Sequence, residues 1–144
     1  MILLPLHAAA TLVMFGVILI VQRVHYPLFR YVRTADYEAF QAIHMRRITW
    51  IVGPAMAVEL ATAGWIVWAP PPGLPAWMGW TGLALVLAIW ATTGLVQVPL
   101  HARLTQGFDA AAHRRLVATN WVRTAAWTLR AGLVCWMLGR GLGG

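Results

Sequence analysis

Residues 116–138 form an apolar run long enough to cross a membrane, and this run contains two arginines, Arg123 and Arg130. On a helix, residues seven apart share a face, so Asn120 and Trp127 align and the two arginines flank the same stripe. An arginine that faces lipid near the centre of a helix costs about 2.5–3.5 kcal/mol on insertion scales. We therefore expect this face to turn toward other helices or toward water.

Three further apolar runs reach the length of about 20 residues that crosses a hydrocarbon layer of roughly 30 Å. They cover residues 3–22, 48–69 and 76–98. The chain is 60% hydrophobic and 10% charged, whereas soluble domains have roughly 25% charged residues. The sequence thus predicts an all-α integral membrane protein, a four-helix bundle in which a single membrane domain takes up residues 1–144.

The eleven basic residues are all arginine and contribute to a net charge of +7. They lie mainly between the first and second spans and between the third and fourth, so they indicate contact with a lipid bilayer and no nucleic-acid partner. By the positive-inside rule both segments are cytoplasmic. We expect a multi-pass protein of the inner (plasma) membrane with both termini outside the cytoplasm. No lysine or arginine precedes Arg23, so the first span lacks the positive start of a cleaved signal peptide and should be retained.

The segment between the first two spans has its own helical pattern. Residues 34–36 are typical of a helix N-cap, and Tyr37, Phe40 and Ile43 follow at helical spacing among arginines. This pattern predicts a short interfacial helix over residues 36–47.

The two halves of the chain are weakly alike. Pro27 and Asp36 follow the first span much as Pro99 and Asp109 follow the third. A parallel internal repeat about an axis along the membrane normal would produce this pattern, and a chance match of short motifs stays open as the alternative.

Glu59 lies about midway along the second span, and Arg130 lies at a similar depth in the fourth. A single buried charge is costly, so we expect Glu59 either to pair with Arg130 or to be protonated. Two interpretations of this intramembrane charge pair stay open. It fixes the helix register alone, or it has a functional role, which is the default hypothesis for ionisable residues inside membranes.

Polar side chains near the cytoplasmic ends of the four spans predict a pocket that opens toward the cytoplasm. They are Gln22, His25, His44, Gln97, His101, Asn120 and Arg123, with Glu59 and Arg130 below them. Pockets between bundle helices that have a few convergent polar groups suit lipophilic small molecules, so we expect a quinone-, polyketide- or isoprenoid-like ligand. The expected contacts are Arg123, Asn120, Gln97 and the histidines for its polar end, and Trp90, Trp127 and Met56 for its tail.

If the pocket is catalytic, His25 or His101 is the expected general base and Arg123 the expected stabiliser of an oxyanion. Histidines on different helices also suit a metal or haem, which would involve His25, His44 and His101. No local ligand spacing such as His-Glu-x-x-His supports a metal site. Histidines at the depth of the lipid headgroups usually only place their polar ring nitrogens at the membrane–water interface. The sequence names no cofactor, and an enzyme and a binding protein both stay open.

Several segments resemble a group of small, uncharacterised bacterial four-helix membrane proteins. The segments are Val24-His25-Tyr26-Pro27-Leu28-Phe29, Gly53-Pro54 with Glu59-Leu60, Gln97-Val98-Pro99-Leu100-His101 and Asn120-Trp121-Val122-Arg123-Thr124. More distantly, Leu116, Asn120 and Arg123 are similar to the last span of the anthrone-oxygenase-like membrane family, whose fungal members are associated with oxidising polyketide anthrones. This second resemblance implies that Asn120 and Arg123 are site residues.

Two other functions stay open. In a small transporter or channel, the pair of Glu59 and Arg130 would serve as a gate or proton relay. A homo-oligomer would then be needed, because a single four-helix protomer has too few helices to enclose a conduction path. In a structural or assembly subunit of a membrane complex, the buried charges would only specify packing.

Overall fold

The computed structural model describes residues 2–142, and every regular element among them is a helix. The expected all-α class is thus confirmed for these residues. The first half consists of α1 (Leu3–Ile20), the π-turn η1 (Val21–His25), the short helix α2 (Tyr26–Leu28), the 3-10 turn η2 (Phe29–Tyr31) and α3 (Thr34–Trp68). The second half consists of α4 (Ala76–Thr92), the π-turn η3 (Thr93–Gln97), α5 (Val98–Leu104) and α6 (Ala110–Leu142).

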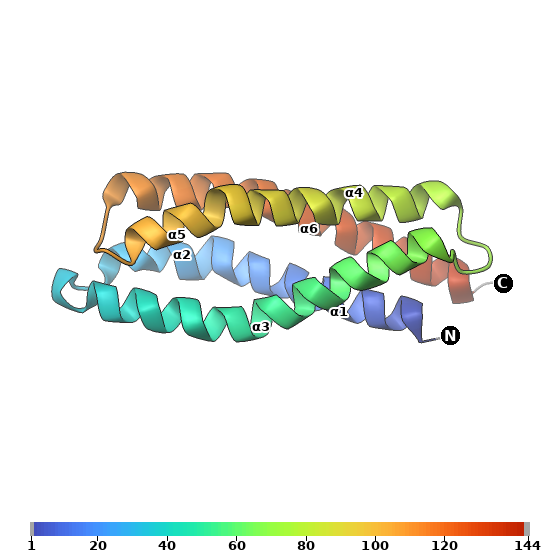
Figure 1. Ribbon diagram of the computed structural model, residues 1–144, viewed down its shortest axis with the longest axis horizontal. Coiled ribbons are helices and arrows are strands. Elements are labelled where there is room, and N and C mark those ends of the chain that lie inside the picture. The colour runs from blue at the N-terminus through green and yellow to red at the C-terminus, as the bar shows by residue number, and fades with distance from the viewer. Residues whose placement is uncertain (1, 143–144) are drawn as a thin grey trace.

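The long helices lie side by side and alternate in direction (Figure 1). α1 packs against α3 and α6, and α4 packs against the same two helices, so each of these four helices has two neighbours. The beginning of α1, the end of α6 and the turn between α3 and α4 lie at one end of the molecule (Figure 1). The larger hydrophobic core fills the space between the helices and includes Met14, Phe29, Leu116 and Trp127.

Three helical segments in the described part of the chain are long and apolar enough to cross a membrane: Leu3–Tyr31, Thr34–Trp68 and Ala76–Leu104. They contain the first three spans expected from the sequence, except for Ala69 at the end of the second. The fourth expected span, residues 116–138, lies inside α6, which is not one of these segments.

Pro27 and Pro99, which follow the first and third apolar spans, each lie two residues after the end of a π-turn. The Tyr26 N–H donates to the Val21 carbonyl, and the Val98 N–H donates to the Thr93 carbonyl, each five residues back. Proline has no N–H and its ring crowds the preceding turn, and a π-turn is the wider local arrangement found inside helices. Pro27 and Pro99 therefore share one local structure, which is what an internal repeat predicts.

The helix expected over residues 36–47 is not a separate element. It forms the first turns of α3, which continues without a break to Trp68. Tyr37, Gln41 and His44 recur on one face of these turns and are buried. The segment thus adds a polar face to the protein interior, which the amphipathic pattern alone did not predict.

Candidate functional site

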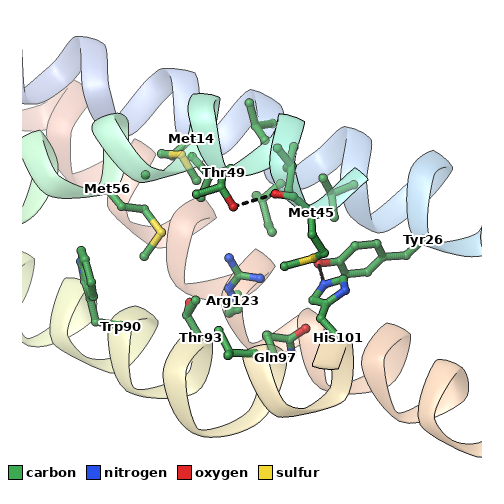
Figure 2. Close-up of a pocket in the computed structure, with 17 residues that line it drawn as sticks. Met14, Tyr26, Met45, Thr49, Met56, Trp90, Thr93, Gln97, His101 and Arg123 are labelled. Atoms are coloured by element: carbon green, nitrogen blue, oxygen red, sulfur yellow. Dashed lines mark hydrogen bonds between the residues drawn. The ribbon is translucent and has the colours of Figure 1, made fainter. Parts of the chain in front are cut away.

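A cavity of about 260 Å³ is lined by residues of α1, η1, α2, α3, α4, η3, α5 and α6. Its wall is mostly apolar, with a few polar groups. The lining residues are Met14, Val17, Ile18, Val21, Tyr26, Met45, Ile48, Thr49, Val52, Gly53, Met56, Trp90, Thr93, Gln97, Val98, His101 and Arg123. Figure 2 shows the Arg123 guanidinium in the middle, with Trp90 toward one end and the Tyr26 and His101 pair toward the other.

Arg123 is 6% exposed, and other groups of α6 hold its guanidinium in place. Its Nη1 donates to Asn120 Oδ1 at 2.9 Å, and its central carbon lies 5.1 Å from the centroid of the Trp127 ring. Its Nε is buried and has no hydrogen-bond partner. The ion pairs among the described residues involve Arg33, Arg103 and Arg130 instead. Arg123 is therefore a positioned cation that no described carboxylate neutralises.

A chain of amides behind Arg123 fixes the orientation of Asn120. The Gln22 Nε2 donates to the Val117 carbonyl at 3.2 Å, so Gln22 Oε1 is the acceptor that remains. Asn120 Nδ2 donates to this oxygen at 2.8 Å, which leaves Asn120 Oδ1 for Arg123. Gln22 and Asn120 thus position Arg123, and neither lines the cavity.

His101 lines the cavity with both ring nitrogens occupied. Its Nε2 lies 2.9 Å from the Tyr26 hydroxyl, and its Nδ1 lies 2.8 Å from Gln41 Nε2. The Tyr26 hydroxyl and the Gln41 amide thus hold the ring in place, with donor and acceptor roles set by the His101 tautomer. Tyr26 lines the cavity beside His101.

The other two candidate histidines pair with each other outside the cavity wall. His25 Nε2 lies 2.9 Å from His44 Nδ1, and the centroids of the His44 and His101 rings are 5.8 Å apart. Within residues 2–142, no three His, Cys, Asp or Glu side chains come together as a group able to hold a metal ion. The structure therefore offers no ligand set for the metal that His25, His44 and His101 were considered to bind.

Glu59 and Arg130 form a second polar cluster, which contributes no residue to the cavity lining. Arg130 Nε donates to Glu59 Oε1 at 2.8 Å, and both side chains are almost fully buried. Glu59 also accepts hydrogen bonds from Thr11 Oγ1 at 2.8 Å and from Trp127 Nε1 at 3.0 Å. Arg130 Nη1 donates to the Gly82 carbonyl. Both oxygens of Glu59 are thus occupied by donors of the protein itself.

The cavity brings together only some of the residues singled out in the sequence. Arg123, His101, Gln97 and Trp90 line it, together with Met56, which was expected beside a ligand tail. The remaining candidates lie behind or beside it: Gln22, His25, His44, Glu59, Asn120, Trp127 and Arg130.

Sequence reasoning missed several lining residues, above all Tyr26, Met14, Met45, Thr49 and Thr93. A usable signal existed for part of this set. Met45, Thr49 and Met56 are separated by four and by seven residues, about one and two helical turns, which places them on one face of α3.

Comparison with models of protein families, with curated proteins and with solved structures found no match for this chain.

Proposed function

We propose that this chain is a multi-pass inner-membrane protein whose cavity binds a lipophilic small molecule through an oxyanionic head held by Arg123. The observation that supports this most strongly is the guanidinium itself, which is buried beside an apolar cavity with a free Nε and no carboxylate partner. Burying an unpaired charge is expensive unless another group compensates it. An anionic oxygen of a ligand would supply that compensation, and quinone-, polyketide- and isoprenoid-like molecules have tails that suit the apolar wall.

The mouth of the cavity suits a ligand that arrives from lipid. Three of the lining residues, Thr49 on α3, Trp90 on α4 and Val98 on α5, are exposed, so the opening lies on the side of the molecule between these helices. In the proposed bilayer Trp90 faces hydrocarbon, and Thr49 and Val98, at the ends of their spans, lie near the cytoplasmic headgroups. The mouth would thus open sideways into the lipid, whereas the sequence predicted an opening directly toward the cytoplasm. A volume of about 260 Å³ is slightly below the ~300–1,000 Å³ of typical ligand pockets, so the head would fit inside and a long tail would extend through the mouth.

The proposal includes α6 as a fourth span. The arginines lower its average apolarity, yet Arg123 and Arg130 are 6% and 1% exposed, whereas Val122 and Leu129 on the outer face are 57% and 62% exposed. An outer apolar face with buried cations is the pattern of a membrane helix that lines a bundle interior.

We further propose that both termini and residues 69–75 lie outside the cytoplasm. The positive-inside rule supports this orientation, and exposed tryptophans mark the two membrane surfaces. Trp65, Trp68, Trp77 and Trp80 flank residues 69–75, and Trp50 and Trp121 lie nearer the opposite end, where most arginines of the connecting segments occur. The first turns of α3 would then lie at the cytoplasmic interface.

The experiment that tests the proposal compares what remains bound to the purified protein. The wild type, Arg123→Met and a control, Arg140→Met, are extracted in mild detergent, and bound small molecules are identified by mass spectrometry. Arg140 is exposed, so its loss changes the same net charge without touching the cavity. We expect a lipophilic acid or other oxygen-rich lipid in the wild type and in Arg140→Met, and at least a tenfold loss in Arg123→Met. Equal retention in all three folded proteins would contradict the proposal.

The transporter alternative has less support from the geometry. Glu59 accepts from three side chains, and the cavity lining does not include it. A proton relay needs a carboxylate that can exchange partners. We therefore propose that Glu59 and Arg130 fix the packing of α3 against α6.

A further inference from the structure

A second unsatisfied polar group in the cavity narrows the class of ligand. Gln97 lines the cavity, is 2% exposed, and its Oε1 is buried without a hydrogen-bond partner. Buried acceptors of this kind are rare in folded proteins and are destabilising when left unsatisfied. Gln97 is therefore expected to meet a donor that the protein does not supply.

The orientation of the Gln97 amide is fixed by its neighbour. Gln97 Nε2 donates to Thr119 Oγ1 at 3.0 Å. The hydroxyl hydrogen of Thr119 is already committed, because Thr119 Oγ1 donates to the Arg115 carbonyl at 2.7 Å. Thr119 can thus only accept from Gln97. Exchanging the amide oxygen and nitrogen would place two acceptors together, so the oxygen is the atom left open.

Arg123 presents the opposite requirement in the same cavity. With Nη1 bound to Asn120 Oδ1, its Nε has no partner, so the Nε–H group can donate to an oxygen of a carboxylate. Arg123 therefore needs an acceptor, and Gln97 needs a donor. Figure 2 shows Gln97 on the η3 and α5 side of the cavity, near the Arg123 guanidinium at its centre.

From this pair we infer that the ligand is a hydroxylated amphiphilic acid, with a carboxylate for Arg123 and a neighbouring hydroxyl group that donates to Gln97 Oε1. This inference rests on the proposed function, since it concerns the same cavity. A plain fatty acid satisfies Arg123 and leaves Gln97 unsatisfied. A neutral long-chain alcohol satisfies Gln97 and leaves the charge of Arg123 uncompensated.

The test measures the affinity of two matched probes for the purified full chain in detergent. The probes are 2-hydroxyhexadecanoate and hexadecanoate, compared at a pH where both are ionised, in the wild type, Gln97→Leu and Arg123→Met. We expect the wild type to prefer the hydroxylated probe by roughly five- to tenfold, the effect of one buried hydrogen bond. Gln97→Leu should bind both probes equally, which separates the hydrogen bond from any difference in acidity. Arg123→Met should weaken both.

The outcomes separate the two proposals. Equal binding of both probes by the wild type, with loss of both in Arg123→Met, would overturn the hydroxyl inference and leave the proposed function standing. Binding of neither probe, or binding that Arg123→Met does not weaken, would overturn the carboxylate head and the proposed function together. A preference that persists in Gln97→Leu would also overturn the inference. The comparison in the wild type needs no variant, so a folding defect in Gln97→Leu leaves the test intact.

Discussion

Removal of the Glu59 carboxylate is the most direct test of what holds the helices together. In Glu59→Leu, Arg130 loses its ion pair at 2.8 Å, and Thr11 and Trp127 lose their acceptor. Arg130 is 1% exposed, so water cannot easily replace the carboxylate. Breaking a buried pair by removing one partner typically costs about 3–5 kcal/mol. We expect a loss of this size in the free energy of unfolding.

The double variant Glu59→Leu with Arg130→Met distinguishes an uncompensated charge from lost packing. Removing both charges also removes the desolvation cost of each, and apolar replacements of buried pairs are often neutral or stabilising. The double variant should therefore be more stable than Glu59→Leu alone, with a coupling energy of about 2 kcal/mol or more.

The assay is equilibrium unfolding in mixed micelles with increasing denaturing detergent, followed by circular dichroism. A matched control is Arg33→Ala, which breaks the exposed pair between Arg33 and Asp36 at 2.7 Å and should cost less than about 1 kcal/mol. If Glu59→Leu were no more harmful than this control, the buried pair would not stabilise the fold, and the reasoning would be refuted.

Three further results are expected. Trp127→Phe removes the indole N–H that donates to Glu59 and keeps a ring beneath Arg123, so it should lower the unfolding free energy by about 1.5–3 kcal/mol while ligand retention in mass spectrometry changes little. Hydrogen bonds from the backbone N–H groups of Ala112 and Ala111 hold the pKa of Asp109 below its usual range. The stability that this carboxylate contributes is therefore present above its unfolded pKa and is lost as the pH falls through the lower folded value, and Asp109→Asn should flatten that part of a thermal-denaturation profile against pH. A reporter fused to the C-terminus should be active on the extracytoplasmic side, and cytoplasmic activity would reverse the proposed topology.

Much of the architecture could be predicted because the apolar runs are long and the charged residues within them are few. Only one acidic residue lies inside the apolar runs, and this scarcity made the partner of Arg130 predictable. Trp90, Thr93, Gln97 and His101 follow one another at intervals of three or four residues. These residues stay on one face of the helix although the π-turn η3 is wider than an α-helical turn. Gln97 and His101 therefore line the cavity, as the sequence predicted.

The choice of His25 over Tyr26 shows where helical periodicity was insufficient. A regular α-helix that carries Met14, Ile18 and Val21 inward also carries His25 inward. The π-turn η1 ends at His25 and adds one residue to the turn, so Tyr26 takes the position that faces the cavity. Pro27 signalled a disturbance of the helix, but a proline can break, bend or widen a helix, and each outcome places the following side chains differently.

The different roles of the two buried arginines follow from charge balance and from one tryptophan. Among the carboxylates of the described chain, only Glu59 is buried, and it can neutralise one of the two cations. Trp127 lies between them, because its N–H donates to Glu59 while its ring face lies against Arg123. Arg130 is thereby held in an ion pair with Glu59. Arg123 lines the cavity and has no carboxylate partner among the described residues. A single helix face thus supplies both a packing contact and the group that we propose binds a ligand.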